Sequence, residues 1–321
     1  MGRGYIFSMY RKSLGMVVLL SAFPLWGEVW YVPGWLRCHV PQGESMEMLR
    51  SLFPEEQVRY YDWEGNSLHW GASLRQADLT ARRLADEVER LAPEARGRLT
   101  LVGHSLGGRI VTRVLAELSR RHLEIRQGVL LGAAIPYDDD DLSQINLASR
   151  EPVLNFINPD DVLLKYCYGP FGGEAHPALG ANGILVPQEN YQEHVVSSAL
   201  LARVDFHLPV MHFSLIKRIA NHHAKFYLHC WKELLLGTSK AEEQRVVIPQ
   251  ERLNLTIPTL GGHLLWSELE SCNGWRLQKN LLTGHCRILD AQNTRRAWGR
   301  ESTMRSAFQK VRRQLERQGN P

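Results

Sequence analysis

Residues 99 to 118 read LTLVGHSLGGRIVTRVLAEL, an apolar run that meets a helix-like stretch at a serine flanked by glycines. The run before the serine has strand propensity, and the apolar residues after it recur at the spacing of one helix face. A G-x-S-x-G pattern between a strand and a helix predicts a sharp turn, in which Gly103 and Gly107 allow close backbone approach and Ser105 takes a sparsely allowed conformation.

Such a turn places the hydroxyl of Ser105 at the C-terminal end of a strand and in front of a helix N-terminus. Free amides and the positive end of the helix dipole favour a developing negative charge there. We therefore expect Ser105 to be a nucleophile and the Leu106 amide to be an oxyanion donor. The alternative is a plain glycine-rich turn with a solvated serine.

From residue 28 onward, strand-like segments alternate with helix-like ones, which is typical of a parallel sheet covered on both faces. The clearest helix is 74–92, where an apolar stripe runs among Arg and Glu residues. We expect an α/β fold with a doubly wound, mostly parallel sheet, whose strand-end loops converge on one crevice at Ser105. The strand candidates are 28–33, 57–62, 98–103, 127–134, 153–158 and about 201–207.

The N-terminus has the organisation of an export signal, in which Arg11 and Lys12 precede the apolar run LGMVVLLSAFPLW. This run is shorter than the ~20 residues that span a bilayer, so residues 1–27 predict a signal peptide and an exported protein. A buried N-terminal strand and an uncleaved anchor are the alternatives. The formal net charge of +4 gives little reason to expect a nucleic-acid partner.

We divide the rest of the chain into a main domain at 28–237 and a C-terminal region of unknown role at 248–321. Segment 169–183, GPFGGEAHPALGANG, is too rich in glycine, proline and small residues for a regular element, and we interpret it as a flap over the site. The C-terminal region ends in a basic helix with one apolar face. Such a helix either touches an anionic membrane or partner, or packs on its domain with a solvated basic face.

Five cysteines lie at positions 38, 167, 230, 272 and 286, and no C-x-x-C pair supports a zinc site of that spacing. Cys272 and Cys286 flank an expected hairpin. In an exported protein they are the first pair to test for a disulfide, and buried free thiols are an equal alternative.

A serine hydroxyl is a weak nucleophile that needs a base within hydrogen-bond reach and a carboxylate to orient that base. Asp160 and Asp161 follow the strand candidate 153–158 at the sheet edge expected for Ser105. An acidic pair after Asn-Pro also suits a helix cap, so at most one of them needs a catalytic role.

The base should follow the acid in the chain, where a loop enters a helix in ANHHAKFYLHCWKELL. From this order alone we choose His223, then His222, then His212. His229 lies deeper in the helix, and His104 is expected to support the elbow. The second oxyanion donor normally comes from the loop after an early strand. EVWYVPGW supplies that loop, with Gly34 for close approach and the Trp35 amide as the candidate; a plain strand-ending turn is the alternative.

The segments GHSLGGRIV, GVLLGAAIP and NPDDVLLKY together resemble the α/β-hydrolase superfamily. They are most similar to its lipase-like branch typified by transmembrane and coiled-coil domain proteins, in which a similar elbow precedes a similar Leu-Leu-Gly-Ala strand. The resemblance covers roughly residues 28 to 236 and favours Asp161 over Asp160, because the aspartate of that branch immediately precedes an apolar run. The Pro-Gly-Trp of the early strand departs from the His-Gly common in lipases, and the stretch from residue 248 lies outside the resemblance.

This resemblance implies an esterase- or lipase-like serine hydrolase that cleaves carboxylic esters through an acyl-enzyme. Ser105 would attack the carbonyl, His223 would relay the proton and Asp161 would orient the imidazole. The amides of Leu106 and Trp35 would hold the oxyanion.

The resemblance implies no cofactor, and the expected partner is a small-molecule or lipid acyl ester; the oligomeric state is open. Two other classes remain. One is an acyltransferase or amidase with the same nucleophile, and the other is a non-catalytic binding protein on the same fold.

Overall fold

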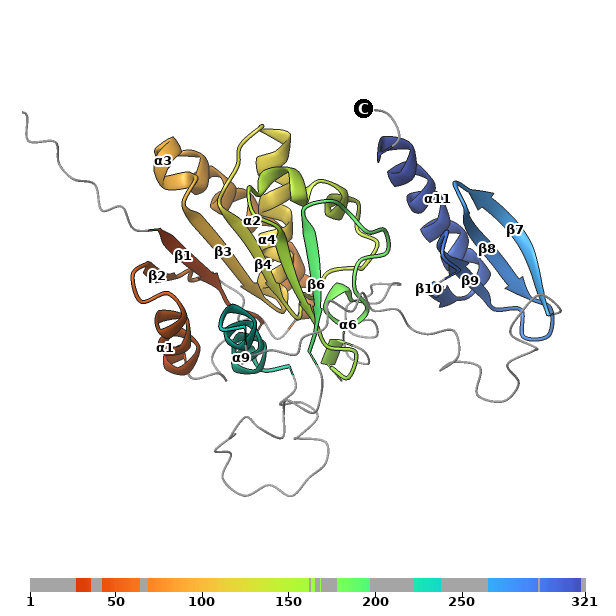
Figure 1. Cartoon of the computed structure of the whole chain (residues 1–321), viewed down its shortest axis with the longest axis horizontal. Coiled ribbons are helices and arrows are strands. Elements are labelled where there is room, and N and C mark those ends of the chain that lie inside the picture. The colour runs from red at the N-terminus through yellow and green to blue at the C-terminus, as the bar shows by residue number, and fades with distance from the viewer. Residues whose placement is uncertain are drawn as a thin grey trace, which may run out of the picture.

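The larger sheet of this computed structural model has six parallel strands in the order β2-β1-β3-β4-β5-β6 (Figure 1). The structure describes residues 27–35, 42–63, 69–161, 163–164, 168, 178–196, 222–237, 265–293 and 295–318. The six strands are β1 (Glu28–Val32), β2 (Gln57–Tyr60), β3 (Leu99–His104), β4 (Gln127–Leu131), β5 (Val153–Ile157) and β6 (Tyr191–Val195).

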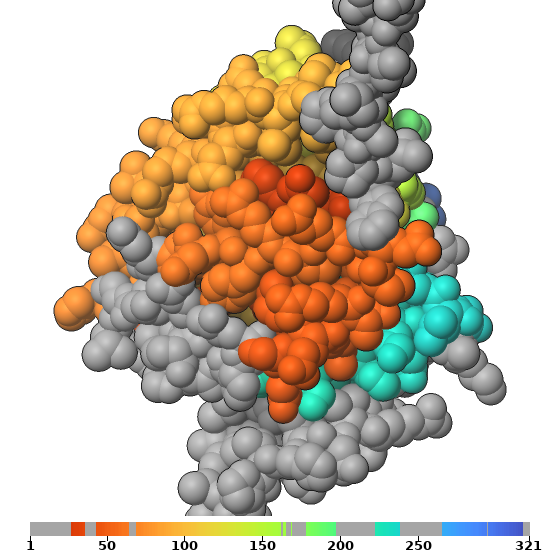
Figure 2. Space-filling model, turned by 90° about the vertical axis from the view of Figure 1, so that its left-hand side faces the viewer, coloured from red at the N-terminus to blue at the C-terminus, as the bar shows by residue number. Residues whose placement is uncertain are grey.

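Alternate residues of each strand point into two separate cores, as the twofold period of a strand requires. Along β1, Trp30 and Val32 join one core, whereas Val29 and Tyr31 join the other. Helices α2 (Trp70–Glu89) and α4 (Leu106–Arg120) complete the first core. Helices α1 (Gln42–Leu52) and α9 (Ala224–Leu235) complete the second and lie next to each other on the surface in Figure 2.

Burial on both faces explains why the central strands are apolar nearly throughout, with every residue of β3 and β5 buried. The structure therefore confirms the predicted doubly wound parallel sheet. Five of the predicted strands are present, each within a few residues of its expected bounds, and the predicted helix 74–92 is the larger part of α2. The sixth candidate, 201–207, lies outside the described residues.

The edge strand β6 was not predicted. Its sequence YQEHV is polar, and of its five residues only His194 is buried. Because β6 pairs only with β5 within the described sheet, it needs no continuous apolar run. Short elements also connect the strands, namely α3 (Pro93–Arg96), the 3-10 helices η2 (Asp140–Ser143) and η3 (Ile145–Ala148), and α6 (Leu179–Asn182).

Helix α6 corrects the prediction of an irregular flap over 169–183. Leu179 and Gly180 are buried, and their amides donate hydrogen bonds to the carbonyls of Ile135 and Ala133. A side chain at position 180 would collide with the backbone of Gly132, so the small residue serves close packing. This part of the predicted flap therefore belongs to the core, and residues 169–177 lie outside the described residues.

A second unit, residues 265–318, is called here the C-terminal unit. Its antiparallel sheet has the order β10-β9-β8-β7. The strands are β7 (Trp266–Cys272), β8 (Trp275–Asn280), β9 (Cys286–Leu289) and β10 (Arg295–Gly299), and one face packs on α11 (Glu301–Gln318). Its core includes Trp275, Ile288 and Phe308, and it is shared with Tyr137 and Leu185 of the main domain.

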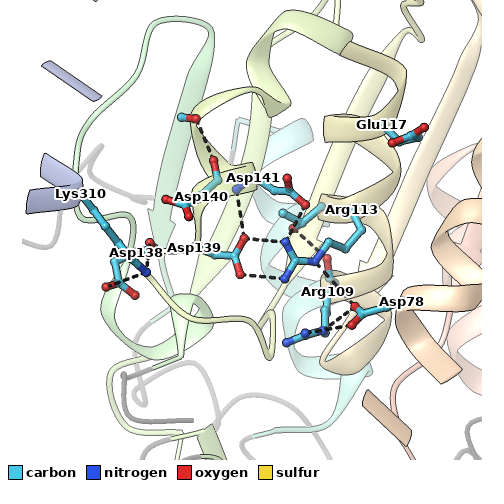
Figure 3. Close-up of polar contacts among 12 residues, drawn as sticks. Asp78, Arg109, Arg113, Glu117, Asp138, Asp139, Asp140, Asp141 and Lys310 are labelled. Atoms are coloured by element: carbon cyan, nitrogen blue, oxygen red, sulfur yellow. Dashed lines mark hydrogen bonds and ion pairs between the residues drawn. The ribbon is translucent and has the colours of Figure 1, made fainter. Parts of the chain in front are cut away.

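Polar contacts also tie the C-terminal unit to the main domain. Arg296 donates to the carbonyl oxygens of residues 184 and 185, and Lys310 lies 3.5 Å from a carboxylate oxygen of Asp138. The neighbouring Asp139 and Asp141 are held by Arg113 of α4, at 2.7 and 2.6 Å (Figure 3). The acidic turn after β4 is thus fixed from one side by α4 and from the other by α11.

The cysteine pair named as the first to test for a disulfide is not bridged. Cys272 pairs with Trp275 at one end of β8, and Cys286 pairs with Lys279 near the other end. Four residues along a strand correspond to about 13 Å, whereas a disulfide needs Cα atoms within about 7 Å. Cys272, Cys286 and Cys230 are free thiols, so of the two alternatives the structure has the free thiols for this pair. Cys38 and Cys167 lie outside the described residues.

The predicted signal peptide falls almost wholly within residues 1–26, which the structure does not describe. Export therefore stays a prediction. None of the helices in the described part of the chain is both long enough and apolar enough to cross a membrane.

Candidate active site

Ser105 stands at the turn between β3 and α4 with φ +53° and ψ −119°, a strained backbone conformation for a non-glycine residue. Crowding explains the flanking glycines. A Cβ at position 103 would lie 2.8 Å from the Cα of Gly108, and one at position 107 would run into the carbonyl oxygens of Val32 and Pro33. The elbow predicted from the sequence is therefore present, wedged against the end of β1.

The side chain of His222 connects Ser105 to Asp161. Its Nε2 lies 2.7 Å from the Ser105 Oγ, and its Nδ1 lies 2.6 Å from Oδ2 of Asp161. Because the carboxylate can only accept a hydrogen bond, Nδ1 carries the proton and Nε2 is free to accept one from the serine hydroxyl. Three residues separated by up to 117 positions in the chain thus form one hydrogen-bonded series.

This geometry corrects the order of the histidine candidates. The first choice, His223, is the N-cap of α9, and its Nδ1 accepts a hydrogen bond from the Lys225 amide at 3.2 Å. Burial lowers the pKa of His223, and its ring serves the helix end instead of the serine. His222, the second choice, takes the position between Ser105 and Asp161. The third choice, His212, lies outside the described residues.

The structure also separates the two aspartates. Asp161 is completely buried, whereas Asp160 is exposed. Oδ1 of Asp161 accepts the Leu164 amide at 3.0 Å, and Oδ2 accepts both His222 and the Tyr227 hydroxyl, the latter at 2.7 Å.

Burial alone would raise the pKa of Asp161, but the charge of a protonated His222 and these hydrogen bonds lower it overall. The carboxylate is therefore held in its ionised form.

His104 supports the elbow from behind. Its ring is buried, and burial together with the nearby His222 lowers its pKa to about 3, so it is neutral at ordinary pH. Its Nε2 lies 2.7 Å from the main-chain carbonyl oxygen of His222, which can only accept, so Nε2 carries the proton. His104 therefore fixes the backbone of His222 directly beside Ser105.

The segment after β1 passes close to the nucleophile. A Cβ at Gly34 would lie 2.9 Å from the Cβ of Ser105, so only glycine fits. This contact brings residue 35 next to the elbow, after which α4 begins at Leu106. Trp35 itself packs edge-on against Trp70, which in turn meets Tyr168. An aromatic cluster therefore stands beside the predicted oxyanion residues.

No group of three or more His, Cys, Asp or Glu side chains that could hold a metal ion occurs within the described ranges. The functional groups of the site are a serine, an imidazole and a carboxylate at the carboxyl end of a parallel sheet. This topology and elbow, with the chain order serine, aspartate, histidine, define an α/β-hydrolase fold.

The model of a family described as "protein of unknown function (DUF726)" matches residues 48–208, half of the chain, and the chain belongs to this family. No curated protein matches this chain.

Solved structures similar to the chain include esterases and a thioesterase. An esterase from Pyrobaculum calidifontis is 16% identical, with 54% of this chain and 57% of that one covered and a TM-score of 0.32. A carboxylesterase from Mesorhizobium loti is 16% identical, with 54% and 80% covered and a TM-score of 0.30. YbtT, a type II thioesterase from the yersiniabactin biosynthetic pathway, is 18% identical, with 35% and 47% covered and a TM-score of 0.26. The chain thus spans less than half of the length of that thioesterase.

Sequence reasoning did not identify Tyr227. The residue is one of the buried residues of α9, so no local pattern distinguishes it from an ordinary core aromatic. Its position five residues after His222 indicates a role in the site only when it is known that the start of α9 faces Asp161.

Proposed function

We propose that this protein is a serine hydrolase that cleaves carboxylic esters through an acyl-enzyme. The observation that carries the proposal is the position of His222, whose two ring nitrogens lie 2.7 Å from Ser105 Oγ and 2.6 Å from Asp161 Oδ2. An imidazole in this arrangement is a general base for the serine, and the buried carboxylate stabilises the imidazolium that forms.

In the acylation step, Nε2 of His222 takes the proton of Ser105 as Oγ attacks the ester carbonyl carbon. The carbonyl π bond opens and gives a tetrahedral intermediate with a negative oxygen. The amides of Leu106 and Trp35 are the proposed donors to this oxygen, supported by the N-terminus of α4 and by the close approach of Gly34 to Ser105. Collapse of the intermediate breaks the bond to the alcohol, which leaves with the proton from His222.

In the deacylation step, a water molecule gives its proton to His222 and attacks the acyl-serine. The second tetrahedral intermediate releases the carboxylic acid and returns the proton to Ser105 Oγ. Asp161 stays ionised throughout, which agrees with the lowered pKa of its carboxyl group. Every proton transfer therefore passes through the imidazole of His222, which contacts both Ser105 and Asp161.

The test is hydrolysis of p-nitrophenyl esters of increasing acyl-chain length by the purified protein. We expect the unchanged protein to hydrolyse these esters, with or without an initial burst. The rate should fall by several orders of magnitude in Ser105→Ala, because the nucleophile is removed. Ser143→Ala is a matched control, because Ser143 is a serine of η2 whose hydroxyl donates a hydrogen bond to the carbonyl oxygen of Asp140 and takes no part in the series Ser105, His222, Asp161. Equal activity of Ser105→Ala and the unchanged protein would contradict the proposal.

A further inference from the structure

The C-terminal unit contacts the main domain at two segments that also reach the candidate site. One is residues 132–138, which follow β4, and the other is residues 178–186, which contain α6. We call them the connecting segments. Three hydrogen bonds of 2.7, 2.9 and 3.2 Å join them, from the amides of Leu179, Gly180 and Leu185 to the carbonyl oxygens of Ile135, Ala133 and Tyr137. A shift of one segment is therefore a shift of both.

At one end, the connecting segments hold the backbone of Ser105 and of the turn that carries Asp161. The Ala134 amide donates a 2.9 Å hydrogen bond to the carbonyl oxygen of Ser105. The carbonyl oxygen of Gly180 accepts the Asn158 amide at 2.8 Å, and the carbonyl oxygen of Asn158 accepts the Asp161 amide at 3.0 Å. The nucleophile and the carboxylate thus depend on the same layer for their positions.

The packing at this end leaves no room for adjustment. A Cβ at position 180 would collide with the backbone of Gly132, and one at position 108 would lie 2.7 Å from the Cβ of Ala133. A Cβ at Gly132 would meet the hydroxyl of Tyr227, the group that bonds to Asp161. Because a close-packed interior transmits a displacement instead of absorbing it, movement of the connecting segments reaches the site.

At the other end, Arg296 of β10 holds the second connecting segment. Its Nη2 donates to the carbonyl oxygen of Ile184 at 2.8 Å, and its Nε donates to that of Leu185 at 3.3 Å. The Ile184 amide donates to Oε1 of Glu193 on β6 at 2.6 Å, and the Leu185 amide bonds to Tyr137. Both residues are buried, so loss of the guanidinium leaves two buried carbonyl oxygens without this donor.

Lys310 of α11 holds the first connecting segment. Its Nζ donates to the main-chain carbonyl oxygen of Asp138 at 3.2 Å and lies 3.5 Å from the buried carboxylate of the same residue (Figure 3). Between the two cations, Tyr137 and Leu185 share an apolar core with Phe308 of α11. The basic helix expected from the sequence is thus packed on its domain, with a lysine directed at the segment that leads to Ser105.

We propose that the C-terminal unit is a positioning element for the candidate active site. Arg296 and Lys310 hold the connecting segments, and these segments hold Ser105 and the turn of Asp161. Neither cation contacts the serine, the imidazole or the carboxylate, so both are positioning residues. The catalytic consequence rests on the proposed function, because it needs an ester-cleaving Ser105 to be observed.

The kinetic test is Arg296→Gln in the full chain. We expect kcat for a p-nitrophenyl ester to fall about tenfold with KM changing by less than about twofold, because misplaced reacting groups lower the rate of the chemical step. Arg296→Lys keeps the charge and can donate to one of the two carbonyl oxygens, so it should recover part of the loss. Lys310→Met should lower kcat in the same direction.

Arg305→Gln is the matched control. Arg305 is an arginine of the same unit, but it pairs with Glu301 and Glu270, which both lie within that unit. The variant therefore removes comparable ion pairs without touching a connecting segment. It should keep the kcat of the parent.

Hydrogen–deuterium exchange tests the same inference without any substrate. Peptides that cover residues 132–138 and 156–161 report the amides of Ala134 and Asn158, which exchange when their hydrogen bonds open. We expect exchange about tenfold faster in Arg296→Gln and unchanged exchange in Arg305→Gln. A parent that neither hydrolyses esters nor reacts at Ser105 would contradict the proposed function, and the exchange measurement would still decide whether the C-terminal unit holds these two amides.

Two results would overturn the proposal. One is an Arg296→Gln protein, folded by circular dichroism, whose exchange at Ala134 and Asn158 equals that of Arg305→Gln. The other is faster exchange at both amides in an active enzyme with an unchanged kcat. If Arg296→Gln does not fold, Arg296→Lys and Lys310→Met decide the question by the same two measurements.

Discussion

The hydroxyl of Tyr227 donates a 2.7 Å hydrogen bond to Oδ2 of Asp161, the same oxygen that accepts Nδ1 of His222. Both the tyrosine ring and the carboxylate are buried, so this bond forms without competition from bulk water. Burial raises the pKa of Asp161, and this bond helps to lower it, after the larger contributions of His222 and the Leu164 amide. Tyr227 is therefore a positioning residue for the histidine and the carboxylate.

Tyr227→Phe keeps the packing of the ring and removes only this bond. We expect kcat/KM for a p-nitrophenyl ester to fall about tenfold, since a hydrogen bond to a charged group contributes about 1.5–3 kcal/mol. The pKa of Asp161 should rise, so activity should begin to fall at a higher pH as the solution is acidified. The pH profile of kcat/KM measures both effects. Tyr60→Phe, on β2, is the control, and an unshifted acid limb in Tyr227→Phe would contradict the positioning role.

Replacing the adjacent histidines should separate catalysis from stability. His222→Ala should lower kcat by about four orders of magnitude, because no other side chain contacts both Ser105 and Asp161 in the described site. His223→Ala should change kcat only a few-fold but lower the free energy of unfolding by about 1 kcal/mol, the usual effect of losing a helix cap. Parallel kinetics and urea denaturation check this, and the reverse pattern would restore His223 as the base.

The approach of Gly34 to Ser105 makes a sharp prediction about the oxyanion loop. In Gly34→Ala the new Cβ would meet the Ser105 Cβ at 2.9 Å, so residue 35 must move away from the elbow. We expect kcat to fall about a hundredfold with a smaller change in KM, as when an oxyanion donor is displaced. Gly43→Ala is the matched control, because nothing lies within 4 Å of its Cβ. A kcat for Gly34→Ala equal to that of the control would exclude this loop from the oxyanion site.

The buried ring of His104 predicts a pH dependence of stability. Its folded pKa of about 3 lies below the ordinary value of 6.5, so between these values the unfolded chain binds more protons than the folded one. Stability from this group is complete above pH 6.5 and is lost as the pH falls, by up to about 1.4 kcal/mol per pH unit. Urea denaturation between pH 5 and 6.5 measures the slope. His104→Gln should flatten it, whereas His122→Asn, at an exposed histidine, should not; equal slopes in the two variants would refute the assignment.

Much of the fold is predictable because its signals are local. Buried parallel strands are nearly all apolar, and the glycines around Ser105 report the crowding at the elbow. The edge strand β6 gives no such signal, since an edge strand can be polar. The distance between Cys272 and Cys286 is not a local signal either. The two cysteines flank strand β8 and pair with residues near its opposite ends, so their separation depends on the length of that strand.

The candidate site was predictable in part for the same reason. Ser105 lies in a local motif, and the resemblance to a known branch favoured Asp161. The choice between His222 and His223 depends on the residue at which α9 begins, and adjacent residues before a helix point in different directions. Identifying Tyr227 requires knowing that α9 lies against the turn after β5 that carries Asp161. Both are tertiary relationships that no single segment records.

The central claim is that Ser105 is an activated nucleophile, and its labelling by a fluorophosphonate probe tests this most directly. We predict covalent labelling of the purified protein, mapped by peptide mass spectrometry to Ser105. The labelling should disappear in Ser105→Ala and should be strongly slowed in His222→Ala but not in His223→Ala. A folded protein that stays unlabelled, or a label on another residue that persists in Ser105→Ala, would contradict the account.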